Sequence, residues 1–325
     1  MEEWCPIENN SEVFTQIIKN IGVKGVQFEE ILSLDSLENS NNQIYGLIFI
    51  SQYIKNIIST PNILSNWDKD LFFSKQLIEN ANAIQAILGI LLNNEDKIDI
   101  GSNLKKLKID MAEMDPVTRG ITLSNNEILK KENNKFKVSN NEGDIYHFVT
   151  FIHFRNEIYE LDGLREGPIL FDKNVEFKDW IKKIKSSLNE KIYLYGNNEL
   201  KFNILALVPD KLEQLKNKKE LLMSQKNYID EKIKGNIDIK NEKYLEELKE
   251  MNKDQLEEKL KKIDIEINEC NNGINIEKMK INKYKEENER RQHNYNPLIF
   301  ELLKIMGENN ILQEVYQKTY NEQNK

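Results

Sequence analysis

The chain has 325 residues, of which 39% are hydrophobic and 31% are charged, and its formal net charge is −8. This balance is typical of a folded protein with one substantial core and a highly charged helical part. Its acidity argues against nucleic acids and membranes as partners, because both require a basic surface. The only cysteines are Cys5 and Cys270, which excludes a disulfide framework and a cysteine-rich zinc site. We therefore expect the protein in the cytoplasm and the nucleus.

Residues 1–209 alternate short β-like runs with helical stretches, which predicts an α/β or α+β domain. Ser11 is the predicted N-cap of the first helix. The predicted helices are Ser11–Ile21, Gln76–Leu92 and Lys178–Leu188. The predicted strands, rich in Ile, Val, Phe and Tyr, are Ile44–Ile50, Tyr146–Phe154, Glu157–Leu161 and Phe202–Val208. The polar stretch Asn133–Asp144 predicts an exposed loop.

Residues 210–325 have a different pattern, in which sparse Leu and Ile positions interrupt a charged helical sequence. This pattern predicts an all-α arm, coiled-coil-like or folded into a hairpin, with Asn271–Gly273 as a break that folds it back. A solvated helical spacer is the alternative interpretation. Pro297 then predicts the start of a helix, since its missing N–H costs nothing there. The apolar face of that helix comprises Leu298, Ile299, Leu302, Leu303 and Met306.

A second short helix, Ile311–Tyr320, follows Gly307. Two amphipathic helices at the end of a charged arm are typical of a docking surface for a partner protein. A small cap that packs on the arm itself is the alternative.

The stretch "KQLIENANAIQAILGILL" begins at Lys75 and has the outline of a catalytic helix. A helix N-terminus stabilises anions, and a cysteine placed there has a lowered pKa. Gln76, just upstream, could donate a hydrogen bond to a tetrahedral oxyanion. The residue at the helix start is however Asn82, and an ordinary helix cap is the alternative interpretation.

His147, in "YHFVTFIHF", precedes Asp162, in "YELDGLREGP", by one strand, one turn and one returning strand. A hairpin of this length would place the two side chains together, as in a triad whose acid orients the imidazole. The alternative is a core histidine and an Asp that starts a turn.

The order of these residues and the segments around them resemble the ubiquitin C-terminal hydrolases. The resemblance rests on "WCPIENNSEVFTQIIKNIGVKGVQFEEILSLD", "GLIFI", "FFSKQLIENANAIQAI", "GITLSN", "HFVTF", "YELDGLREGPI" and "KFNILALV", which span Trp4 to Val208. "YKEENERRQHNYNPLIFELLK" is similar to the C-terminal extension of the long, proteasome-associated branch of that family.

The resemblance implies a papain-like α/β core with a knotted backbone, which hydrolyses bonds at the ubiquitin C-terminus without a metal or organic cofactor. It assigns the oxyanion-stabilising role to Gln76, the general base to His147 and the orienting acid to Asp162. The nucleophile falls on Asn82, where the family has cysteine. A carboxamide is not a useful nucleophile, because its nitrogen lone pair is delocalised. We therefore expect an inactive chain, either a natural pseudoenzyme or a form altered to hold its substrate.

The resemblance also implies ubiquitin as a partner. Glu29, Glu30 and Asp35 lie in the family segment near the groove for the basic ubiquitin tail, and Leu32 is the candidate apolar contact. Ordinary surface acids are an equal alternative for each carboxylate. Asn125–Asp144 corresponds to the family's active-site crossover loop.

The C-terminal extension resembles a segment that docks onto the proteasome's ubiquitin-receptor subunit, and in some members onto a chromatin-remodelling subunit. The resemblance thus favours docking for the apolar face of the predicted Pro297 helix.

Overall fold

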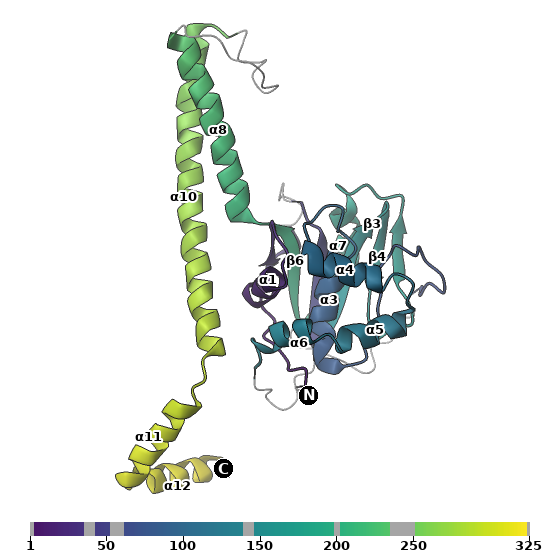
Figure 1. The fold of residues 1–325 in the computed structure, drawn as a ribbon, viewed down its shortest axis with the longest axis vertical. Helices are drawn as coiled ribbons and strands as arrows, with labels where there is room; N and C mark the ends of the chain where they lie inside the picture. Colours follow the sequence, from purple (N-terminus) through teal and green to yellow (C-terminus); the bar gives the residue numbers. More distant parts are fainter. Residues whose placement is uncertain are drawn as a thin grey trace. The chain divides into compact units, whose positions relative to one another are not determined.

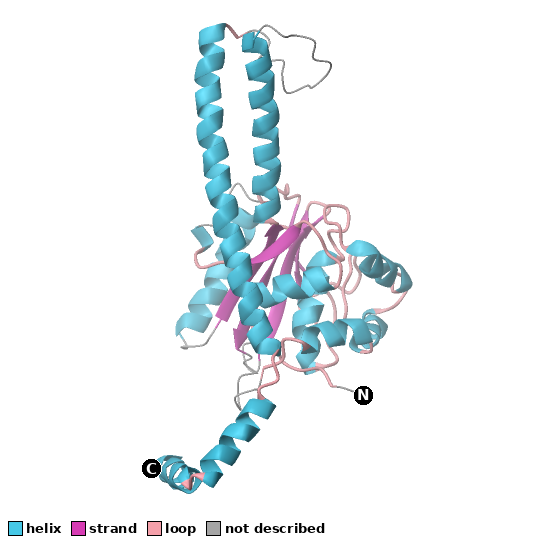
Figure 2. Ribbon diagram, turned by 60° about the vertical axis from the view of Figure 1, so that its left-hand side comes forward, coloured by secondary structure: helices cyan, strands magenta, loops and turns pink. Residues whose placement is uncertain are grey.

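The computed structural model describes residues 3–35, 43–52, 62–138, 146–197, 202–234 and 251–323. It divides into two compact units, Met1–Tyr284 and Lys285–Lys325, so the boundary expected after residue 209 falls inside the first unit. Six strands of that unit form one antiparallel sheet, drawn in magenta in Figure 2, with helices on both of its faces.

The sheet has the strand order β1-β6-β2-β3-β4-β5. Its strands are β1 (Val26–Glu30), β2 (Gly46–Gln52), β3 (Tyr146–Phe154), β4 (Glu157–Leu161), β5 (Ile169–Lys173) and β6 (Phe202–Pro209). The four predicted strands are confirmed, whereas β1 and β5 were not predicted. Both are short edge strands of five residues, and their mixed polar composition gives a weak pattern.

One face of the sheet is covered by several helices of the described ranges (Figure 1). They are α1 (Ser11–Asn20), α3 (Asn82–Leu91), α4 (Gly101–Asp110), α5 (Pro116–Ser124) and α6 (Glu127–Asn134). The central one is α3, which is apolar on nearly every side and therefore buried on nearly every side. It packs closely on the sheet at Gly46, where an added Cβ would lie 2.7 Å from Ile90. The core thus fixes α3 relative to β2 and β3.

The opposite face is covered by α7 (Trp180–Asn197). Successive side chains of each strand point to opposite faces of the sheet, as the period of a β-strand requires. Leu47 and Phe49 pack with Trp180 of α7, whereas Ile48 and Ile50 belong to the core around α3.

The predicted boundaries of two helices and one loop differ from those in the structure. The N-cap of α1 is Asn10, whose side chain accepts the Val13 N–H, and Ser11 is the first helical residue. The helix predicted from Gln76 begins only at Asn82, after a 3-10 turn η1 (Glu79–Ala81). Asn133 and Asn134 are not in an exposed loop, because they end α6 and are buried. The rest of that predicted loop from residue 139 lies outside the described residues.

The helical region begins with α8 (Lys211–Lys234) and α10 (Lys253–Gln292). These two helices pack against each other, as the charged pattern with sparse apolar positions predicted. The packed residues of the pair are Leu222, Ile229, Leu256, Ile263 and Cys270. The break predicted at Asn271–Gly273 is wrong, since α10 continues through it, and Gly273 instead allows a close approach by Leu215.

The second unit contains α11 (Asn296–Glu308), with Pro297 in its first turn, and α12 (Ile311–Gln323). Gly307 lies inside α11 rather than after it. None of the helices in the described part of the chain combines the length and apolar character needed to cross a membrane.

Candidate active site

His147 and Asp162 come together because β3 and β4 form one antiparallel hairpin. The register pairs Thr150 with Leu161, so the start of β3 lies beside the residue that follows β4. His147 Nε2 is 2.9 Å from Asp162 Oδ1. The hairpin predicted from the sequence therefore does bring these two side chains into hydrogen-bonding contact.

The Asp162 carboxylate is buried and surrounded by donors. Besides His147, it receives the Leu164 N–H at 3.0 Å and the Arg165 Nε at 3.3 Å. Burial raises the pKa of Asp162, but the His147 bond, the Leu164 N–H and the Arg165 charge together outweigh burial and lower that pKa below its ordinary value. An ionised carboxylate at this point can orient an imidazole and stabilise its charged form.

Asn82 is the first residue of α3, and both polar atoms of its side chain are engaged. Its Nδ2 donates to the Tyr146 carbonyl at 2.8 Å, and its Oδ1 accepts the Ala83 N–H at 2.8 Å. Tyr146 directly precedes His147, so the Asn82 side chain bonds to the strand that supplies the histidine. The second of these bonds engages an N–H of the first helical turn, but the N-cap of α3 is Ala81, so the interpretation of Asn82 as an ordinary cap is wrong.

Gln76 lies in the irregular segment before η1, where its backbone is fixed by the turn that follows Asp162. The Gln76 N–H donates to the Gly163 carbonyl at 2.8 Å. A Cβ at Gly163 would lie 2.9 Å from the Gln76 Cβ, so only glycine fits there without displacement. The two segments that hold Gln76 and Asp162 are thus in direct contact.

Gln76, the expected oxyanion donor, and the backbone N–H of Asn82 share one internal acceptor. The Asn82 backbone N–H donates to the Glu79 carbonyl, and Gln76 Nε2 lies 3.5 Å from the same oxygen. An oxyanion bound at this point would compete with the Glu79 carbonyl for both donors.

A pocket of about 270 Å³ opens beside these residues. Its lining combines the polar groups of the site with exposed apolar side chains. The lining residues are Gln76, Leu77, Ile78, Glu79, Tyr146, His147 and Leu164. This composition, mostly apolar with a few convergent polar groups, is typical of ligand sites.

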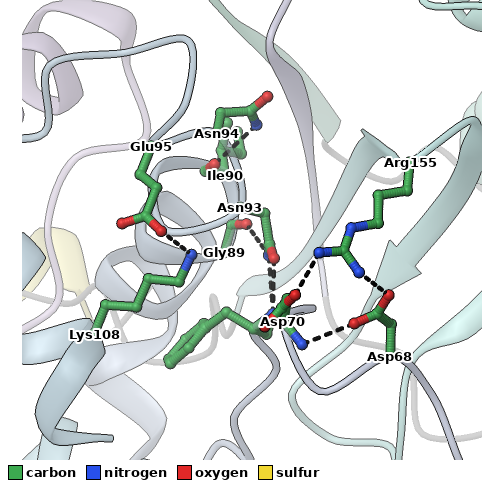
Figure 3. A network of polar contacts seen from close by, with 10 residues as sticks. Asp68, Asp70, Gly89, Ile90, Asn93, Asn94, Glu95, Lys108 and Arg155 are labelled. Carbon is green, nitrogen blue, oxygen red and sulfur yellow. Dashed lines mark hydrogen bonds and ion pairs between the residues drawn. The ribbon is translucent and has the colours of Figure 1, made fainter. Parts of the chain in front are cut away.

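The buried segment from Phe72 to Lys75 pairs with no strand among the residues that the structure describes, and polar side chains satisfy part of its backbone instead. The Asn93 side chain pairs with both the N–H and the carbonyl of Phe72, at 2.7 and 2.9 Å. The buried Arg119 guanidinium donates to the Phe73 carbonyl, and the Gln85 amide donates to the Lys75 carbonyl. Figure 3 shows Asn93 also bonded to Gly89, in the last turn of α3.

The sequence interpretation missed Asn93, Arg119 and Gln85. The available signal was their polarity: Asn93 directly follows an apolar helix, and Gln85 is the only polar residue between Ala83 and Leu92. Figure 3 also shows that Arg155, in the turn after β3, forms ion pairs with Asp68 and Asp70. These pairs connect the β3–β4 hairpin to the segment before Phe72.

The candidate ubiquitin contacts lie at the end of β1 and just beyond it. The end of β1 and the start of β3 lie at the same end of the sheet, with β6 and β2 between them, since Ile31 bonds to Ile204 and Ser51 pairs with both Phe202 and His147. Leu32 is 90% exposed, while Glu29 accepts a bond from Gln27. Glu30 is also exposed. Asp35 forms an ion pair with Lys185 at 2.8 Å, which lowers the pKa of Asp35.

The apolar residues predicted to form a docking face in the C-terminal region all lie on α11. No residue of α11 is buried, and Leu298, Ile299, Leu302 and Leu303 are among the exposed large apolar side chains. Met306 is half-buried.

The other candidate ligands and nucleophiles lie apart from these residues. His153 is buried and bonds to the Val175 carbonyl at 2.6 Å. Cys5 lies against α6, where its backbone bonds to Asn133 and Asn134. Across the described ranges, no three His, Cys, Asp or Glu side chains are grouped so that they could hold a metal ion.

Comparison with known proteins identifies similar sequences and structures over most of the chain. Residues 4–193 match the family described as "Ubiquitin carboxyl-terminal hydrolase, family 1", and residues 267–312 match a second family described as "Ubiquitin carboxyl-terminal hydrolases". The chain is 32% identical to ubiquitin carboxyl-terminal hydrolase isozyme L5 of Dictyostelium discoideum, over 98% of this chain and 95% of that relative. It is 33% identical to ubiquitin carboxyl-terminal hydrolase ubh-4 of Caenorhabditis elegans, over 98% and 91% respectively.

A solved structure is also similar, that of Trichinella spiralis UCH37 bound to ubiquitin vinyl methyl ester. Its TM-score is 0.64 at 28% sequence identity, and the match covers 86% of this chain and 99% of that one.

Proposed function

The chain belongs to family 1 of the ubiquitin carboxyl-terminal hydrolases, and from this premise we propose that it binds ubiquitin at a hydrolase site that lacks a nucleophile. The single observation that supports this proposal is the side chain of Asn82. It occupies the start of α3, bonds to the residue before His147, and has a carboxamide where the family has a thiol.

A carboxamide at this point cannot form the acyl intermediate of a cysteine hydrolase. Its nitrogen is not basic, and in this structure that nitrogen already donates to the Tyr146 carbonyl at 2.8 Å. The proposal assigns the oxyanion-donor role to Gln76 and the roles of base and orienting acid to His147 and Asp162, and the 2.9 Å contact between the last two supports it.

A cysteine at residue 82 would complete the site. Its thiolate would attack the carbonyl carbon of the C-terminal glycine of ubiquitin, and Gln76 with the residue-82 N–H would stabilise the oxyanion. Protonated His147 would give its proton to the leaving amine. Water would then hydrolyse the thioester and restore the thiol.

The test of this function has two parts. Calorimetry with ubiquitin measures binding by the chain itself, and a fluorogenic ubiquitin C-terminal amide measures turnover by the chain and by its Asn82→Cys variant. We expect ubiquitin binding by both proteins and turnover by the variant alone. Absence of ubiquitin binding would instead favour a helical scaffold with a closed groove.

We also propose that α11 docks this chain onto the ubiquitin-receptor subunit of the proteasome, or onto a chromatin-remodelling subunit, in the cytoplasm and the nucleus. The exposure of Leu298, Ile299, Leu302 and Leu303 supports this docking, because four large apolar residues on one exposed helix favour burial against a partner. The rim residues Glu29, Glu30, Leu32 and Asp35 are proposed contacts for the basic tail of ubiquitin.

A further inference from the structure

Gln85 lies one turn after Asn82 on α3, on the same face of the helix. It is the only polar residue between Ala83 and Leu92, and a polar group in such a helix requires a partner. Its Nε2 donates to the Lys75 carbonyl at 2.7 Å. The helix that begins with Asn82 therefore contacts the residue directly before Gln76.

The Lys75 carbonyl and the Gln76 N–H belong to the same peptide unit, and both are bonded. The carbonyl accepts from Gln85, while the N–H donates to the Gly163 carbonyl at 2.8 Å. One bond comes from α3 and the other from the turn after Asp162. Together they fix the orientation of this peptide plane, and hence the direction in which the Gln76 side chain leaves the backbone.

The orientation of the Gln85 amide is itself determined by its surroundings. Its Nε2 must face the Lys75 carbonyl, because an oxygen placed there would repel the carbonyl oxygen. Its Oε1 is buried and has no hydrogen-bond partner among the described residues. Gln85 also lines a cavity of about 30 Å³ together with Gln76, Asn82 and Gly163. One water molecule fits a space of this size.

We propose that Gln85 is a positioning residue for the hydrolase reaction, which holds the Lys75–Gln76 peptide so that the Gln76 amide meets the oxyanion. This inference rests on the proposed function for the role of Gln76. A residue that acts in this way changes the stability of the transition state more than the binding of ubiquitin. Its loss should therefore lower kcat and leave KM unchanged.

The kinetic test is a double-mutant cycle in the Asn82→Cys background, with the fluorogenic ubiquitin amide as substrate. Gln85→Met keeps the volume and removes the donor, and Gln85→Glu replaces the donor with oxygen. We expect each to lower kcat about tenfold, which is less than the 10²–10³ typical of a lost oxyanion donor, with KM within about twofold. In the Gln76→Ala background we expect Gln85→Met to have less than about a twofold effect, because coupled residues are non-additive. Gln16→Met, on α1, is the matched control and should leave kcat unchanged.

Equal losses of kcat in both backgrounds would overturn the proposal, because they would indicate a general effect on the fold. An unchanged kcat in Gln85→Met would overturn it as well. If Asn82→Cys itself has no turnover, the proposed function fails, and hydrogen exchange in the parent chain then tests the positioning alone. We expect Gln85→Met to speed exchange of the Gln76 N–H about tenfold, with the Leu91 N–H of α3 unchanged. Unchanged exchange at Gln76 would contradict the inference.

Discussion

His147 Nε2 lies 2.9 Å from Asp162 Oδ1, and both residues belong to one β-hairpin whose register sets that distance. The hairpin is held on its far side by Arg155, which pairs with Asp68 and Asp70. The acid and the imidazole are thus positioned by local chain geometry, whereas Asn82 and Gln76 reach the site from other parts of the chain.

The His147–Asp162 pair gives the first prediction. In the Asn82→Cys background, Asp162→Asn removes the charge that orients and stabilises the imidazolium, so kcat should fall by about 10² or more. Glu160→Gln, on β4 two residues before Asp162, is the control and should change kcat by less than about twofold. A variant Asp162→Asn that retained full kcat would show that this carboxylate does not assist His147.

Gly163 gives the second prediction. Gly163→Ala places a Cβ 2.9 Å from the Gln76 Cβ, so one of the two segments must move. We expect kcat in the Asn82→Cys background to fall by about tenfold or more, because a displaced Gln76 loses its oxyanion contact.

The matched control for Gly163 is Gly89→Ala on α3. Its added Cβ would lie 3.5 Å from Leu161, which is ordinary van der Waals contact, and alanine in a helix interior is more stable than glycine by about 0.5–1 kcal/mol. Gly89→Ala should therefore keep kcat and raise the melting temperature. Equal kcat in the two alanine variants would show that a Cβ at residue 163 does not displace Gln76.

The sequence predicted the His147–Asp162 contact because a hairpin is local, and strand length alone brings its two ends together. The same reasoning could not predict how Gln76 is held, since Asn93, Arg119 and Gln85 bond to backbone groups of an irregular segment that follows no helix or strand period. The helix around Asn82 was predicted too early, because the periodicity of residues 76–81 does not reveal a 3-10 turn. The edge strands β1 and β5 were missed because their polar residues weaken the alternation.

Asn93 provides a prediction about stability. Asn93→Ala leaves both the N–H and the carbonyl of Phe72 buried without a partner, so the free energy of unfolding should fall by about 2–4 kcal/mol. Urea unfolding monitored by circular dichroism measures this loss. Asn20→Ala, which removes an exposed amide on α1, should cost less than about 1 kcal/mol. Similar losses in the two variants would show that Asn93 does not support the segment.

His153 provides a prediction about pH. Burial lowers the pKa of His153 below 6.5, and its bond to the Val175 carbonyl only partly opposes this effect. The unfolded chain therefore binds a proton more readily below pH 6.5, so the free energy of unfolding should fall as the pH drops through that value. Above pH 6.5 the free energy of unfolding should not depend on the protonation of His153. Urea unfolding of the chain and of His153→Gln at pH 7.5 and 5.5 tests this, and an equal pH dependence in both proteins would contradict it.

The apolar face of α11 provides a prediction about partners. Leu302→Asp should abolish capture of the chain by the docking domain of the proteasomal ubiquitin receptor, because a charge in an apolar contact is costly. Lys304→Asp, on the same helix, introduces the same side chain outside the apolar set and should retain capture. Normal capture of Leu302→Asp would reject docking through this face.

The central claim is that the carboxamide of Asn82 prevents turnover at this site. The most direct test measures steady-state turnover of the fluorogenic ubiquitin C-terminal amide by the chain and by its Asn82→Cys variant. We predict turnover by the Asn82→Cys variant and at least about a thousandfold less by the chain itself, because the acyl intermediate cannot form on a carboxamide. Comparable turnover by the two proteins would contradict the account, since hydrolysis would then proceed without a thiol at residue 82.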